Sequence, residues 1–290
     1  MSYLADAFSN LKSALEITQT EQQQASSRRQ AIYDHVGDHW DITSAFLTGS
    51  YDRHTKTKKL KDVDIFVVVD PDGDQASLRQ RGPSAVLDDL KLVLDQKYPG
   101  QVAVDVVACV ISFGTDEIMS FEVVPAFDRP GGGYEIPDTA TGGWIATDPT
   151  KHAEATTAKN TACDGKWVPF VKMVKGINRE AGEPIEPSFL IEVMALELIR
   201  EPFGRYQDEI ASFCASAADQ VADDWPDPAG LGPAVNRTMS TWDRQQAAAQ
   251  FKAWQLTAEQ AIDLEDGGSE RAAVEKWREL FGNRMPRPAT

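Results

Sequence analysis

The stretch Gly49-Ser50-Tyr51, followed by Asp62-Val63-Asp64-Ile65-Phe66-Val67-Val68-Val69, says most about the fold of this chain. The valine-rich run predicts a strand, because β-branched residues favour the extended backbone. Residues two apart on a strand point to the same side, so Asp62 and Asp64 present their carboxylates together. Gly49 and Ser50 predict a turn beside this strand, whose backbone N–H groups would hold phosphates.

Two carboxylates held this close repel each other, and a cation between them would offset the repulsion. Mg²⁺ takes its oxygen ligands from one or two carboxylates and from substrate phosphates. Asp62 and Asp64 therefore predict a metal site next to the phosphate-binding turn. Aspartates at strand ends are also common solvated residues, so the pair taken alone is equally explained as a structural edge feature.

A third carboxylate stands in a second apolar run, from Val102 to Val110. Asp105 has apolar neighbours on both sides, and an unpaired charge is costly to bury. If this run is a strand beside the first, Asp105 completes a cluster of three carboxylates that holds two metal ions, and it could take the proton from an attacking hydroxyl. The structural alternative requires a buried partner for Asp105, such as an arginine.

These residues together resemble the DNA polymerase β-type nucleotidyltransferase superfamily. Within it, the pattern Gly-Ser-Tyr-x-Arg-x-Thr-x(6)-Asp-Val-Asp-Ile of residues 49–65 is similar to the bacterial enzymes related to cyclic GMP-AMP synthase and oligoadenylate synthase, the DncV-like, CD-NTase or SMODS family. Those enzymes make cyclic oligonucleotide signals in anti-phage defence. Three further segments resemble the same group: Tyr134–Asp138, Trp144–Pro149 and Lys276–Gly282.

The resemblance also implies a lysine and, on the next helix, a serine that hold the triphosphate from the side opposite the metals. Lys175 and Ser188 match these positions. Ile177 departs from the family, in which a bulky aromatic residue often stands there. Lys172 competes with Lys175 for the phosphate contact, and Ser188 is also explained as a helix N-cap.

The charge balance bears on the partners of the protein. The 290 residues include 29 lysines and arginines against 45 aspartates and glutamates, a net charge of −16. Such an acidic chain disfavours binding to a long nucleic acid, which depends on clustered basic residues. Five basic residues nevertheless stand between the turn and the carboxylates, where they form either a solvated loop or a phosphate-steering patch: Arg53, Lys56, Lys58, Lys59 and Lys61.

The first part of the chain predicts a mixed α/β core. A helical pattern runs to about Gly37 and is placed as one long helix behind the sheet. Strands are expected over Ser44–Thr48, Val63–Val69 and Val102–Ile111, with a helix that begins near Pro83. Its apolar face is formed by Val86, Leu87, Leu90, Val93 and Leu94.

Residues 128–150 are rich in Gly, Pro, Thr and Asp and are expected to form loops, with Asp148 or Thr147 as the cap of a following helix. Beyond them we expect helices over Trp167–Ile177, Pro187–Arg200, Arg205–Val221, Thr241–Glu265 and Gly268–Phe281. The sequence thus predicts an α+β fold: a polymerase β-like nucleotidyltransferase core with a mixed sheet and flanking helices over residues 1–160, and a C-terminal helical domain over residues 161–290 that closes the nucleotide cleft.

The predicted activity is the condensation of ribonucleoside triphosphates, as donor and acceptor, into a cyclic di- or oligonucleotide. Two Mg²⁺ ions, or Mn²⁺, would be held by Asp62, Asp64 and Asp105, while Gly49, Ser50, Lys175 and Ser188 bind phosphate. Three alternatives remain: transfer to an RNA end, transfer to a protein or small-molecule hydroxyl, and a nucleotide sensor without turnover. Base choice, ring size, linkage and any regulatory partner cannot be read from the sequence.

The remaining features of the sequence concern the location of the protein in the cell, the state of its cysteines and the recognition of a nucleotide base. No apolar run is long enough to span a bilayer and the N-terminus lacks the features of a signal peptide, so a cytoplasmic protein is expected. The cysteines have no metal-ligand spacing and are expected to be buried thiols: Cys109, Cys163 and Cys214. Four aromatic residues are candidates for stacking on a base: Phe113, Phe127, Tyr134 and Trp144.

Overall fold

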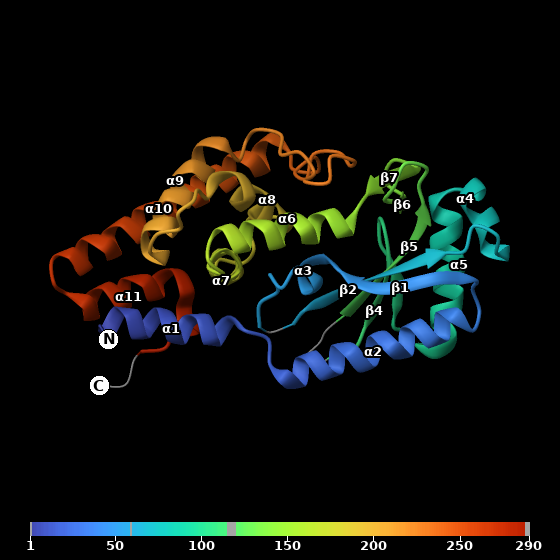
Figure 1. The fold of residues 1–290 in the computed structure, drawn as a ribbon, viewed down its shortest axis with the longest axis horizontal. Coiled ribbons are helices and arrows are strands. Elements are labelled where there is room, and N and C mark those ends of the chain that lie inside the picture. The colour runs from blue at the N-terminus through green and yellow to red at the C-terminus, as the bar shows by residue number, and fades with distance from the viewer. Residues whose placement is uncertain (1, 59, 115–119, 288–290) are drawn as a thin grey trace. The chain divides into compact units, whose positions relative to one another are not determined.

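The computed structural model describes residues 2–58, 60–114 and 120–287 (Figure 1). Its helices and strands form two compact units. Residues 17–153 form one, which we call the sheet unit, and residues 1–16 together with 154–290 form the other, the helical unit. The predicted boundary after residue 160 and the observed division after residue 153 both fall within one helix, α6 (Pro149–Ala162).

A mixed sheet forms the centre of the sheet unit. Among the described residues its main strands lie in the order β1-β2-β5-β4-β3, and β6 and β7 extend it from β5. Strands β2 and β5 are parallel, and the other pairs are antiparallel. The strands are β1 (Ile42–Thr48), β2 (Asp62–Val69), β3 (Val102–Val104), β4 (Cys109–Ser112), β5 (Ser120–Asp128), β6 (Tyr134–Asp138) and β7 (Gly143–Thr147).

One face of this sheet is covered by two helices, α2 (Gln19–Gly37) and α5 (Pro83–Lys97) (Figure 1). Strand β2 contributes alternate residues from Val63 to Val69 to this core, as the period of a strand requires. Helix α5 begins with Pro83 and buries the five apolar residues that the sequence predicted. Short helical turns complete the unit: α3 (Gly49–Asp52), η1 (Asp74–Ser77) and α4 (Leu78–Arg81).

The opposite face of the sheet carries a smaller apolar cluster that includes Phe66 and Val68 of β2 and Val124 and Ala126 of β5. Strand β2 is therefore apolar on both faces along most of its length, and its two aspartates stand at its N-terminal end. This is the mixed sheet with flanking helices that the sequence predicted, and the α+β fold class is confirmed.

The prediction of one long N-terminal helix is wrong. Helix α1 (Tyr3–Leu15) ends before Glu16, whose backbone is extended, and α2 begins after Thr18. Thr18 and Glu21 form a reciprocal capping box, which satisfies the free N–H groups of a new helix start. Of these two helices, α2 packs on the sheet. Helix α1 belongs to the helical unit, where the ring of Phe8 meets that of Trp277 edge to face at 5.3 Å.

The sequence predicted loops over residues 128–150, but part of this segment forms strands, because β6 and β7 pair there as a hairpin. The expected cap is confirmed: Asp148 Oδ1 accepts hydrogen bonds from the N–H groups of Thr150 and Lys151 at 3.1 and 3.2 Å, at the start of α6.

Seven described helices belong wholly or in part to the helical unit, and all of them except α6 contribute apolar residues to one core. Besides α1 and α6 these are α7 (Trp167–Glu180), α8 (Phe189–Leu198), α9 (Tyr206–Gln220), α10 (Thr241–Asp266) and α11 (Glu270–Phe281), followed by the turn η2 (Gly282–Arg284). The expected helical second half is confirmed. Within the part of the chain that is described, no helix has the length and apolar character needed to cross a membrane.

Candidate active site

The Gly49-Ser50 turn lies directly against the aspartate strand. Gly49 opens α3 immediately after β1, and its backbone has a φ of +65°, a region that glycine adopts without strain. A Cβ atom at this position would stand 1.8 Å from Oδ2 of Asp64. The absence of a side chain at Gly49 is thus what lets the turn approach the carboxylate.

Asp64 is the inner of the two aspartates on β2. It pairs with Thr48 of β1 on one side and with Glu122 of β5 on the other. Burial raises the pKa of the Asp64 carboxyl, the positive charge of Lys56 opposes that rise, and the negative charge of Asp62 adds to it.

Asp62 is two residues earlier, on the same side of the strand, as the sequence predicted. Its Oδ2 atom lies 2.5 Å from Nζ of Lys56 in a salt bridge. The Asp62 side chain is 38% exposed and that of Lys56 only 11%, so the carboxylate stays open to a ligand while the ammonium is largely enclosed.

The predicted place of Asp105 in a continuous strand is wrong. The run from Val102 to Ile111 folds back on itself as the antiparallel strands β3 and β4, and Asp105 lies exposed in the connection. Its N–H donates to the carbonyl of Ala108 at 2.9 Å, and its Oδ1 accepts from the N–H of Val106 at 2.7 Å. Its charge is exposed to solvent, so the cost of burial that made it a candidate ligand does not arise.

Glu122 occupies the place expected of the third carboxylate. It lies on β5, which runs parallel to β2, and its Cα is paired with that of Asp64. A hydrogen bond between the Glu122 and Asp64 side chains partly opposes the rise in the pKa of Asp64. Burial, together with the negative charges of Asp64 and Asp62, raises the pKa of Glu122 to about 7.

The sequence carries a signal for Glu122 as well. Glu122 is a single charge within the apolar run Phe121 to Phe127, which is the same kind of signal that selected Asp105. The two runs are distinguished by their pairing: β5 lies next to β2, whereas β3 is separated from β2 by two strands.

The donor set of Asp62, Asp64 and Glu122 suits a hard divalent cation, which prefers carboxylate oxygens. The burial of Asp64 and Glu122 and the repulsion within the cluster raise the pKa values of these two groups, and a bound cation would relieve both penalties. Among the described residues, no three acidic, histidine or cysteine side chains are already arranged as a metal-binding group. Asp62 is instead paired with the ammonium of Lys56.

The other predicted phosphate ligands, Lys175 and Ser188, belong to the helical unit. Nζ of Lys175 forms a salt bridge of 2.5 Å with Oε1 of Glu192, and both side chains are almost fully buried. Ser188 stands at the N-cap of α8, and its side chain forms no capping hydrogen bond. The competing candidate Lys172 pairs with Glu16 at 2.6 Å. The phosphate role of Lys175 and Ser188 stays a prediction.

Of the four aromatic candidates for base stacking, three lie on the helix-covered side of the sheet and one lies on the opposite side. Phe113 lies under the guanidinium of Arg28, and Phe127 meets Trp144 edge to face at 5.3 Å, all in the core on the helix-covered side. Tyr134 lies on the opposite side, which also bears the carboxylates. Its ring centroid lies 6.0 Å from those of Phe46 and Phe66.

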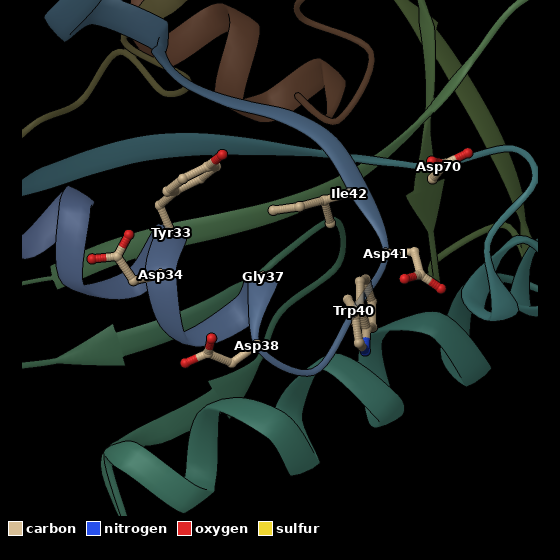
Figure 2. Close-up of a pocket in the computed structure, with 8 residues that line it drawn as sticks. All are labelled: Tyr33, Asp34, Gly37, Asp38, Trp40, Asp41, Ile42 and Asp70. Carbon is tan, nitrogen blue, oxygen red and sulfur yellow. The ribbon is translucent and has the colours of Figure 1, made fainter.

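A separate acidic pocket of about 510 Å³ lies at the other end of strands β1 and β2 (Figure 2). The end of α2, the start of β1 and the residue after β2 form its lining: Tyr33, Asp34, Gly37, Asp38, Trp40, Asp41, Ile42 and Asp70. Ile42 and Asp70 are at the opposite strand ends from Thr48 and Asp62, so this pocket is distinct from the candidate active site.

Comparison with known proteins agrees with this geometry. The protein family described as SMODS, Second Messenger Oligonucleotide or Dinucleotide Synthetase domain, matches residues 1–160. A cyclic AMP-AMP-AMP synthase from Acinetobacter sp. (strain ATCC 27244 / 9458) is 24% identical over 302 residues, which cover 98% of this chain and 85% of that protein.

Solved structures share the fold over nearly the whole chain. CdnG of Bradyrhizobium diazoefficiens, a CD-NTase in complex with GTP, superposes with a TM-score of 0.77 at 15% identity and covers 98% of this chain and 97% of its own. CdnC of E. coli MS115-1, solved with ATP, gives a TM-score of 0.68 at 18% identity and covers 97% and 98%. With the family match spanning more than half of its residues, the chain belongs to the Second Messenger Oligonucleotide or Dinucleotide Synthetase family, and it is a nucleotidyltransferase.

Proposed function

We propose that the protein joins ribonucleoside triphosphates into a cyclic di- or oligonucleotide with release of pyrophosphate. The reaction would take place on the face of the sheet that bears Asp62, Asp64 and Glu122. The observation that carries the proposal is the pairing of β2 with β5, which brings these carboxylates together beside Gly49. A triphosphate held at such a turn has its α-phosphorus within reach of carboxylate-bound cations, the arrangement used for in-line phosphoryl displacement.

The three carboxylates would hold Mg²⁺, with Mn²⁺ as a substitute and two ions per site. When bound, these cations stabilise the charge that develops on the attacking and leaving oxygens. Asp62 and Asp64 would both serve as ligands, since they lie on one side of the same strand.

Glu122 takes the role that the sequence assigned to Asp105. Glu122 would accept the proton of the ribose hydroxyl that attacks the α-phosphorus. Its position on the strand beside Asp64 keeps this step next to the metal ligands.

Phosphate binding is divided between two groups of residues. The backbone N–H of Gly49 and the hydroxyl of Ser50 would bind the β- and γ-phosphates. Lys175 and Ser188 would neutralise and orient the oxygens that remain, as the family resemblance implies. Glu192 would then orient Lys175, because their salt bridge fixes the position of the ammonium.

The choice of acceptor follows from the charge of the chain. A net charge of −16 favours small nucleotides over a polynucleotide, since non-specific nucleic-acid binding requires clustered basic residues. The product would be a second messenger in bacterial anti-phage signalling, made in the cytoplasm. The competing activities, transfer to an RNA end or to a protein or small-molecule hydroxyl, use the same carboxylates and differ only in the acceptor.

Product analysis tests the proposal. The purified protein is incubated with the four ribonucleoside triphosphates and Mg²⁺, and the soluble products are identified by mass spectrometry. We expect a cyclic oligonucleotide and pyrophosphate, both absent from the Asp62→Ala/Asp64→Ala variant. Pyrophosphate release that requires added RNA or protein would support the competing transferases, and tight nucleotide binding without turnover under all conditions would support the sensor.

A further inference from the structure

Lys56 is a largely enclosed cation within the candidate active site. It lies in the connection between α3 and β2, and its Nζ is 2.5 Å from Oδ2 of Asp62. Its side chain is 11% exposed, although most lysine side chains extend into solvent. The position of this ammonium therefore needs an explanation within the site.

The loop itself holds Lys56 next to the phosphate-binding turn. The carbonyl of Ser50 accepts hydrogen bonds from the N–H groups of both Thr55 and Lys56 at 3.0 Å. The side chains of Thr55 and Thr57, on either side of Lys56, are buried. The backbone of Lys56 is thus fixed by its neighbours, and the flexible stem alone decides where the ammonium lies.

The charge of Lys56 acts on all three carboxylates of the site. It is paired with Asp62, and it lowers the pKa values of both Asp64 and Glu122. Lys58, on the same loop, is exposed, and its charge acts on Glu21 instead. Lys56 therefore compensates the repulsion within the cluster, which is also what a metal ion would do.

We infer that Lys56 is the resident counter-cation of this carboxylate cluster, and that a divalent cation must displace its ammonium from Asp62 before it can bind. The inference rests on the proposed function, since it takes Asp62, Asp64 and Glu122 as the metal ligands. A metal ion bound to Asp62 and an ammonium at salt-bridge distance from the same carboxylate repel each other. The four-carbon stem lets Nζ move away without any change in the loop backbone.

Two consequences follow from this competition. Without nucleotide, the cluster binds divalent cations weakly, because each ion must break the Lys56–Asp62 salt bridge. With a triphosphate bound, the added negative charge draws in the metal and provides a new partner for the released ammonium. Lys56 would thus delay metal loading until substrate is present.

The experiment measures metal binding directly, in the absence of nucleotide. Mn²⁺ is titrated into the full-length protein, and free Mn²⁺ is followed by electron paramagnetic resonance. Lys56→Met should bind Mn²⁺ roughly tenfold more tightly than wild type, because the competing charge is gone. Lys56→Arg keeps the charge and should stay within about twofold of wild type. Lys58→Met is the matched control, a charge lost from the same loop, and should also stay within about twofold.

The outcomes separate this inference from the proposed function. In the first case, wild type binds Mn²⁺ and Asp62→Ala/Asp64→Ala abolishes this binding. Equal or weaker Mn²⁺ binding by Lys56→Met then overturns the role of Lys56 but not the metal site. If neither wild type nor Lys56→Met binds Mn²⁺, even with a non-hydrolysable triphosphate, the metal site and the inference are both overturned. Circular dichroism checks the fold of each variant, and Lys56→Gln provides a second neutral substitution if the methionine variant does not fold.

Discussion

Gly49 and Asp64 are in direct contact: a Cβ on Gly49 would lie 1.8 Å from Oδ2 of Asp64 and 2.7 Å from its Cγ. The turn and the carboxylate strand are separate in the sequence, yet they pack directly against each other. The parts of the candidate site proposed to bind phosphate and metal therefore adjoin.

Replacing Gly49 should abolish turnover for a steric reason. In Gly49→Ala the new methyl group displaces the Asp64 carboxylate, so we expect product formation by mass spectrometry to fall at least about 100-fold, the range seen when one catalytic group is misplaced. Gly142→Ala is the matched control, because Gly142 has a φ of +71° but nothing within 4 Å of its Cβ position. It should cost about 1 kcal/mol of stability and leave turnover intact. Similar activity losses in both variants would mean that strain, not the contact with Asp64, matters.

Glu122 and Asp105 should differ sharply in their contribution to catalysis. Glu122→Gln removes the carboxylate beside Asp64, and we expect kcat to fall about 100-fold or more, in the range typical of a lost general base. Asp105→Asn, in the exposed connection between β3 and β4, should stay within about threefold of wild type. Steady-state rates of pyrophosphate release measure both. A large loss in Asp105→Asn with full activity in Glu122→Gln would restore the assignment made from the sequence.

The salt bridge between Lys175 and Glu192 should stabilise the helical unit. Both side chains are less than a tenth exposed, so Glu192→Ala leaves a buried ammonium without this partner. We expect its free energy of unfolding, measured by denaturant titration, to fall by about 3 kcal/mol or more. No change in the unfolding midpoint would show that the ammonium finds another partner.

A double variant separates the structural role of Lys175 from its proposed phosphate contact. Lys175→Met/Glu192→Leu replaces the pair with apolar residues of similar volume, so it should recover most of the lost stability. If Lys175 binds the triphosphate, this folded variant should still show a KM for ATP raised at least about tenfold. An unchanged KM would assign Lys175 to the fold alone.

The three cysteines should resist thiol reagents in the native state. All are buried, and burial raises the pKa of the Cys109 thiol to about 12. Because the thiolate is the reactive form, a raised pKa leaves almost none of it at pH 8. Alkylation by iodoacetamide at pH 8, followed by intact mass measurement, should add nothing to the native protein and three groups to the protein in guanidinium chloride. Rapid labelling of the native protein would contradict this.

The local sequence was sufficient to predict several elements of the structure. The apolar face of α5 and its start at Pro83 follow from helical spacing and from the fixed φ of proline. The placement of Asp62 and Asp64 on one side of β2 follows from the period of a strand. Both depend on residues close together in the chain, which is why the sequence predicted them.

Other features depended on how distant segments pair. The capping box of Thr18 and Glu21 marks the start of α2 locally, but the assignment of α1 and α2 to different units depends on two separate cores that helical spacing does not indicate. Likewise, the partner of Lys175 lies on the next helix and is defined by the packing of α7 against α8.

The sequence by itself determined the family, the Gly-Ser turn and the aspartate strand, since these are properties of contiguous residues. Only the tertiary structure decided which further carboxylate lies beside Asp64. Asp105 and Glu122 each stand in an apolar run of similar composition, and the order of strands places Glu122 beside Asp64 while Asp105 lies in a solvent-exposed connection. Strand order depends on the packing of the whole sheet against α2 and α5, so the composition of a single run does not reveal it.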